Sequence, residues 1–195
     1  MFEKLRTYGK LVYIPGNHDP GHMFRHQEEG NIHGRAMELA DDLLILGLGG
    51  SIQDYVQKNG EGPLVPCWDA FPYKEEDHSR FNQELATLWA LSLDFKGEVI
   101  LMTHEGPQLS STSKNQYFWD NNTTYVAGSP ALRELMLANS EKITCNIHGH
   151  LHDGAFYQNL WKPHHPLPII NPGSLKQSEF GELELEKKDG KWKVK

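Results

Sequence analysis

The sequence predicts a layered α/β fold, in which a β-sheet sandwich is flanked by helices. Three features of the chain indicate this fold. Apolar, strand-like runs recur along it, and several of them end in polar loops. Segments with the apolar spacing of a helix lie between some of these runs. The length of 195 residues, 38% of them hydrophobic and 23% charged, fits one globular domain over residues 1–195.

The first half of the chain contains two strand-like runs. Residues 10–16 (KLVYIPG) are rich in β-branched and aromatic side chains, and residues 41–50 (DDLLILGLGG) form a continuous apolar run. Between them, residues 22–31 predict a short helical turn that ends at Gly30. Residues 54–76 contain repeated glycine and proline, which predicts a long irregular loop.

Two helices are expected in the second half. Residues 77–95 place Phe81, Leu85 and Leu88 on one face, with the period of a helix. Residues 129–140 begin with Ser-Pro, which is typical of an N-cap followed by the first helical residue.

The remaining expected elements are strands. Apolar runs at 98–107, 142–154 and 167–174 each predict a strand that leads into a loop. Residues 181–195 alternate around Asp189-Gly190, which is the signal of a hairpin with a type I′ turn.

Four loops that follow predicted strands contain chemically useful side chains. They read GNHD at 16–19, THEGP at 103–107, HGHLH at 148–152 and NPGS at 171–174. In sheets of this kind, sites form beyond the carboxyl ends of the strands. We therefore expect the four loops to meet at one sheet edge and to form a site there.

Two of these loops contain histidines at spacings that suit metal binding. His150 and His152 lie two residues apart, so they point to one side of an extended segment or bind two neighbouring ions. His104 adds an imidazole from another strand end, and Asn17 offers a carbonyl oxygen. Nitrogen and oxygen donors without a thiolate favour divalent Mn, Fe or Zn, and Cys145 is expected in the core.

The GNHD loop also places His18 between Asn17 and Asp19. An imidazole whose tautomer is set by Asp19 can donate a proton to a leaving oxygen. A centre of two ions roughly 3.5–4 Å apart orients a phosphate and activates a bridging hydroxide. Together these residues predict hydrolysis of a phosphate ester, with His18 as the general acid.

In their order along the chain, GNHD, LMTHEGP, HGHLH and NPGS resemble the later motifs of the calcineurin-like metallophosphoesterases. The similarity runs from about residue 11 to about residue 185. It implies that family's fold, a dinuclear metal centre and hydrolysis of a phosphate-ester substrate by attack of a metal-bound hydroxide. It also implies individual roles: Asn17, His104 and His150 bind one ion, His152 binds the other, His18 is the acid and Asp19 orients it.

The motifs that normally open the family's pattern, Asp-x-His and Gly-Asp, do not occur in this sequence. By resemblance, the sheet would lack its first two strand-loop units and no carboxylate would bridge the ions. The chain is then N-terminally incomplete, has a sheet edge covered by an oligomer or a partner, or has lost catalysis. Because GNHD and GHLH are intact, we favour an incomplete chain of an active enzyme.

Two other functions stay open at this point. One is a non-catalytic metal-binding or protein-interaction scaffold on the same fold, and the other is a mononuclear metal-binding protein that uses Asn17, His104 and His150. Within the enzyme hypothesis, the irregular segments 51–80 and 108–127 are expected to determine which ester is bound.

Charge, apolar runs and cysteine spacing argue against several partners and against a secreted or membrane-spanning protein. The net charge of −7 argues against binding to nucleic acid or to anionic membranes. No apolar run has the length of a membrane span, and the first ten residues lack the apolar core of a signal peptide. The two cysteines are far apart, so no disulfide framework is expected. A cytoplasmic location follows as the expectation.

The other histidines are expected to have structural or surface positions. His148 precedes the ligand pair and should pack beneath it. His22 should lie at the surface, and His33 should be a polar surface group or a cap group.

Overall fold

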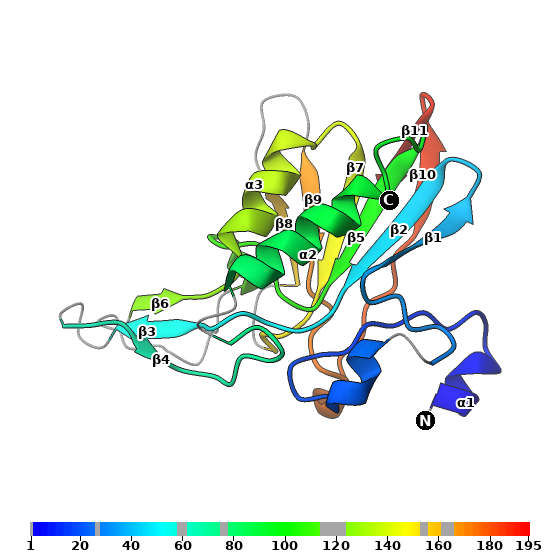
Figure 1. The fold of residues 1–195 in the computed structure, drawn as a ribbon. Coiled ribbons are helices and arrows are strands. Elements are labelled where there is room, and N and C mark those ends of the chain that lie inside the picture. The colour runs from blue at the N-terminus through cyan, green and yellow to red at the C-terminus, as the bar shows by residue number, and fades with distance from the viewer. Residues whose placement is uncertain are drawn as a thin grey trace.

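The fold is built on one six-stranded sheet (Figure 1). The computed structural model describes residues 2–25, 28–57, 62–74, 78–113, 124–152, 156–160 and 166–195. The strand order is β1-β2-β5-β7-β9-β8. Their bounds are β1 Arg35–Ala40, β2 Leu43–Leu48, β5 Glu98–Thr103, β7 Ile143–His148, β8 Tyr157–Leu160 and β9 Leu167–Ile170.

The four inner strands are parallel, and the two edge strands are antiparallel to their neighbours. Every residue of β2 is buried, as its continuous apolar run predicted. Successive side chains of β2 point to opposite faces, so Leu44 and Leu46 enter one apolar cluster while Leu43 and Ile45 enter the other. The sheet therefore separates two layers of core.

Helices cover the first of these faces, and α2 (His78–Ala90) and α3 (Pro130–Ala138) lie side by side across it (Figure 1). The predicted apolar face of α2 is the buried one, since Phe81, Leu85 and Leu88 all belong to the cluster on this side. The ring of Phe81 meets Tyr73 edge to face, with 5.1 Å between ring centroids.

The opposite face is covered by the C-terminal hairpin of β10 (Leu185–Lys188) and β11 (Lys191–Val194). Asp189 and Gly190 at its turn have φ of 54° and 78°, as a type I′ turn requires. Trp192 packs on this face and donates its indole N–H to Asp42 at 3.0 Å. The predicted α/β class, a sheet layered with helices, is confirmed.

Two predicted segments differ from expectation. Residues 10–16 form no strand but an extended segment with one isolated bridge, between Tyr13 and Asn31. Its side chains Val12 and Ile14 still pack on the hairpin side of the sheet, which explains the strand-like pattern.

The segment predicted as a long loop contributes two strands to a separate three-stranded sheet. β3 (Tyr55–Gln57) pairs with β4 (Val65–Pro66) and with β6 (Thr124–Val126). These short strands extend from the main body in Figure 1. A short helix, α1 (Phe2–Arg6), and a 3₁₀ turn, Gly21–Arg25, complete the N-terminal part. In the described part of the chain, no helix has the length and apolarity needed to cross a membrane.

Ser129 caps helix α3 as the sequence predicted, and its hydroxyl accepts the backbone N–H of Leu132 at 3.1 Å. Replacing it by alanine leaves that buried N–H without a partner, so Ser129→Ala should lower the free energy of unfolding by about 0.5–2 kcal/mol. Urea denaturation would measure the loss. Ser79→Ala, on the exposed surface of α2, is the matched control and should change it by less than about 0.5 kcal/mol.

Candidate metal centre

The inner strands bring the predicted loops to one edge of the sheet. Thr103, the last residue of β5, pairs with Leu48 of β2 and with His148 of β7. His104 is therefore the first residue beyond the sheet, and its backbone N–H donates to Leu48 at 2.9 Å while its carbonyl accepts the Gly149 N–H at 3.2 Å. For the THEGP and HGHLH loops, the convergence expected from parallel strands is confirmed.

The GNHD loop is attached to the same edge. Gly50, just after β2, donates its N–H to the Pro15 carbonyl at 2.9 Å, and the Asp19 carboxylate accepts the Gly16 N–H at 2.7 Å, which closes the turn. A Cβ on Gly16 would lie 2.7 Å from Cε1 of His104. Glycine is therefore required here because the loop backbone contacts the imidazole directly.

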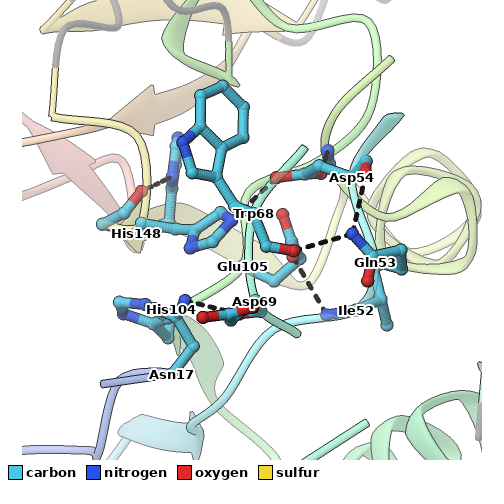
Figure 2. A network of polar contacts seen from close by, with 12 residues as sticks. Asn17, Ile52, Gln53, Asp54, Trp68, Asp69, His104, Glu105 and His148 are labelled. Atoms are coloured by element: carbon cyan, nitrogen blue, oxygen red, sulfur yellow. Dashed lines mark hydrogen bonds and ion pairs between the residues drawn. The ribbon is translucent and has the colours of Figure 1, made fainter. Parts of the chain in front are cut away.

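Asn17 and His104 meet through the atoms that would bind a metal ion. Oδ1 of Asn17 lies 2.9 Å from Nε2 of His104, and Nδ2 of Asn17 donates to the Asp69 carbonyl at 2.8 Å. Figure 2 shows Asn17, His104 and Asp69 together at this point. Since the amide nitrogen is engaged with Asp69, the oxygen faces the histidine. Two ligands of one ion at roughly 2.0–2.2 Å are separated by about 3 Å, so the spacing fits.

Four more histidines gather around this pair. The ring of His150 lies against that of His104, with 5.2 Å between centroids. Burial holds the pKa of His104 well below its usual range, and the charges of His150, His148, His152 and His18 lower it further. The imidazole of His104 is thus neutral, which is the form that binds metal ions.

His150 is held from one side by a carboxylate. Its Nε2 lies 2.8 Å from Oδ2 of Asp54, and both side chains are buried. Its Nδ1 is buried too and has no hydrogen-bond partner. His150 also has a φ of 66°, a left-handed conformation that is strained for a residue other than glycine. The backbone is thus distorted at a predicted ligand.

Glu105 adds a second buried carboxyl group behind His150. Together with Asp54 and His150, it offers donor atoms that all lie within 4.8 Å of one another. Glu105 accepts the backbone N–H of Ile52 at 3.2 Å. Burial and repulsion by Asp54 raise the pKa of Glu105. Burial alone would lower the pKa of His150, but Glu105 and Asp54 outweigh it and raise that pKa.

The NPGS loop positions the histidine loop. Asn171 is buried, and its Nδ2 donates to the carbonyls of Leu151 at 2.6 Å and Thr112 at 3.0 Å. Its Oδ1 accepts the N–H of Gly173 at 3.1 Å, which closes the turn. Asn171 therefore supports the backbone between His150 and His152.

The remaining predicted site residues are exposed. His18, Asp19 and His152 all lie on the solvent side of the cluster, and His18 and His152 are close enough to lower the pKa of His104. The contact of Asp19 is with the loop backbone, at Gly16. Solvent access suits side chains that contact a substrate. Asn17, by contrast, is buried on the protein side of the cluster.

Two histidines outside the predicted ligand set are buried near the site, one as expected and one not. His148 packs beneath the cluster as expected, with its Nε2 2.8 Å from Oγ1 of Thr112. His33 was expected as a surface group or a cap group, and the surface position was wrong. It is buried, because its Nδ1 accepts the backbone N–H of Gly49 at 2.9 Å and its ring packs on Phe24.

Asp54 and Glu105 are the residues that sequence reasoning missed. Glu105 follows His104 directly in THEGP, so its proximity to the site was visible in the motif. Asp54 lies in the turn-rich segment before β3 and has no local signal, since only the fold brings it to His150. Of the segments expected to bind substrate, residues 58–61, 75–77 and 114–123 lie outside the described part of the chain.

Solved structures show the same fold. One crystal structure, 13% identical, aligns with 90% of this chain and 61% of its own, with a TM-score of 0.58. The structure of TT1561 of Thermus thermophilus is 16% identical in sequence. Its alignment covers 96% of this chain and 72% of TT1561, with a TM-score of 0.50. A third structure is that of a 5′-nucleotidase candidate from Staphylococcus aureus, solved with alpha-ketoglutarate and 11% identical in sequence. Its alignment covers 99% of this chain and 38% of that protein, with a TM-score of 0.51. This chain thus spans less than two thirds of the first of these structures.

The sequence itself shows the family. No curated protein sequence gives a significant match. The family model of the calcineurin-like phosphoesterases, however, matches residues 1–154, most of the chain. That range contains GNHD, THEGP and HGHLH, the loops that meet at the sheet edge. The chain therefore belongs to the calcineurin-like phosphoesterase family.

Proposed function

We propose that this chain is a divalent-metal-dependent phosphoesterase. Asn17, His104 and His150 would hold one ion, and His152 would contribute to a second. The substrate would be a phosphate ester that enters from the solvent side, where His18 and His152 lie.

One observation supports this proposal most directly. The oxygen of Asn17 and Nε2 of His104 are 2.9 Å apart, and the ring of His150 has its centroid 5.2 Å from that of His104. Nδ1 of His150 is buried without a hydrogen-bond partner. A buried polar atom without a hydrogen bond costs about 1–3 kcal/mol, and a metal ion at this position would satisfy it. The nitrogen and oxygen donors fit Mn, Fe or Zn.

The chain's own residues have separate tasks in this reaction. When bound, divalent ions polarise the phosphoryl oxygens and lower the pKa of water. His18, on the exposed GNHD turn, would donate a proton to the leaving alkoxide. Asp19 keeps that turn closed through its bond to Gly16, and so positions His18. The glycine at 16 lets the turn lie directly on His104.

Hydrolysis assays test the proposal. The purified chain, supplied with Mn²⁺, should hydrolyse p-nitrophenyl phosphate or bis-p-nitrophenyl phosphate, and EDTA should abolish the activity. His104→Ala should reduce turnover to the level of the assay without enzyme, because it removes a central ligand. His22→Ala, which removes a histidine with 62% of its side chain exposed, is the matched control and should leave turnover unchanged.

The alternative of a non-catalytic scaffold predicts another outcome. A folded chain that hydrolyses neither ester with Mn²⁺, Fe²⁺ or Zn²⁺ would contradict the proposed function. Activity that survives both EDTA dialysis and His104→Ala would contradict the assignment of the metal ligands.

A further inference from the structure

The two ring nitrogens of His150 have different surroundings. Nε2 lies 2.8 Å from a carboxylate oxygen of Asp54, with only 5% and 1% of the two side chains exposed. An ionised carboxylate can only accept a hydrogen bond, so Nε2 donates to it. Nδ1, on the other side of the ring, is buried and has no partner. The ring is thus anchored by one nitrogen and free at the other.

Asp54 itself is a rigid anchor. The second oxygen of its carboxylate accepts the Gly128 N–H at 3.3 Å. Its backbone carbonyl accepts the Cys67 N–H at 3.1 Å and the side-chain amide of Gln53 at 2.9 Å. Figure 2 shows Asp54 and Gln53 on the side of the site opposite Asn17. Gly128 therefore fixes the carboxylate itself, and Cys67 and Gln53 fix the backbone of Asp54 from which it extends.

We propose that Asp54 is a positioning residue for the metal ligand His150. By accepting the Nε2 proton, it selects the tautomer whose Nδ1 lone pair is free, and it orients that lone pair for an ion shared with Asn17 and His104. Histidines that bind metals almost always donate their other ring N–H to a carboxylate, a carbonyl or water, and the removal of such a partner typically costs 10–100-fold in metal affinity. This inference rests on the proposed function.

A different arrangement would place the ion among Asp54, Glu105 and His150 themselves, since their donor atoms lie within 4.8 Å. The contacts favour the positioning role. Both carboxylates already accept backbone N–H groups, from Gly128 and Ile52, and Nε2 of His150 is engaged with Asp54. The atom of this group without a partner is Nδ1, which lies away from Asp54 on the ring.

Two measurements on the full chain test the inference. Long-range ¹H–¹⁵N correlation spectra of the metal-free protein report the tautomer of His150, and we expect the proton on Nε2. Calorimetric titration with Mn²⁺ reports affinity. Asp54→Ala should weaken Mn²⁺ binding about 10–100-fold. Asp54→Asn, whose amide oxygen still accepts the N–H, should recover part of that loss. Circular dichroism confirms that each variant is folded.

Further variants separate the two arrangements. Under the proposal, His104→Ala abolishes Mn²⁺ binding, and Glu105→Gln weakens it by less than the 10–100-fold expected of Asp54→Ala. If Glu105→Gln weakens binding as much as Asp54→Ala while His104→Ala binds normally, the ion lies among the acidic groups and the inference is overturned. Unchanged affinity in Asp54→Ala, or a neutral His150 ring whose proton is on Nδ1 and not on Nε2, overturns it as well.

The wild-type chain separates a failure of the proposed function from a failure of the inference about Asp54. If the wild-type chain bound no Mn²⁺ and hydrolysed no ester, the proposed function would be wrong whatever Asp54 does. If the wild type binds and hydrolyses while Asp54→Ala does the same, only the inference about Asp54 is wrong.

Discussion

Replacing His18 by asparagine is expected to reduce hydrolysis of an alkyl phosphate by about 10²–10⁴-fold, the usual contribution of general acid catalysis. An alkoxide is a poor leaving group and needs the proton, whereas p-nitrophenolate leaves without one. The loss on p-nitrophenyl phosphate should therefore be much smaller. His18 is exposed and is not among the metal ligands, so Mn²⁺ affinity should stay the same. Steady-state kinetics on both esters would measure the difference.

The control for this experiment is His22→Asn, four residues further along the same exposed segment. It removes an imidazole of similar exposure and should leave turnover of both esters unchanged. If His18→Asn lowers the turnover of both esters equally, or of neither, then His18 does not protonate the leaving group. An equal loss together with weaker Mn²⁺ binding would point to damage of the metal site instead.

The largest effect on stability is expected from Phe81→Ala. Phe81 has no solvent exposure and lies between helix α2 and the sheet, in edge-to-face contact with Tyr73. Its removal loses the buried apolar surface and leaves a cavity, so the free energy of unfolding should fall by about 3–5 kcal/mol. Urea denaturation followed by circular dichroism measures this change.

A matched control lies just beyond the same helix. Leu91 is 52% exposed, so Leu91→Ala should change the free energy of unfolding by less than about 0.5 kcal/mol. A loss below about 1 kcal/mol for Phe81→Ala would contradict the packing of α2 on the sheet.

The sequence predicted the inner strands and both long helices because burial imposes a simple pattern on them. The run that became β2 is buried on both faces, so it is continuously apolar. The residues of β1 have mostly exposed side chains, so no such pattern marked this edge strand. Residues 10–16, by contrast, look like a strand because Val12 and Ile14 are partly buried. Among the described residues, they form one isolated bridge and no strand.

The sequence predicted those residues of the candidate site that directly follow a strand. His104 and His150 each come just after a strand end, and their ring contact follows from the parallel pairing of β5 and β7. Asp54 reaches the site from an irregular segment, by a contact that spans 96 positions of sequence, and no local pattern encodes such a contact. For the same reason the sequence could not show which nitrogen of His150 is free.

The central claim is that Asn17, His104 and His150 form a metal site. Elemental analysis of the 195-residue chain after equilibrium dialysis against Mn²⁺ tests it most directly, with His104→Ala dialysed in parallel. The account predicts at least one tightly held Mn²⁺ per wild-type chain and none in the variant. A wild-type chain without Mn²⁺, or a variant that retains as much as the wild type, would contradict it.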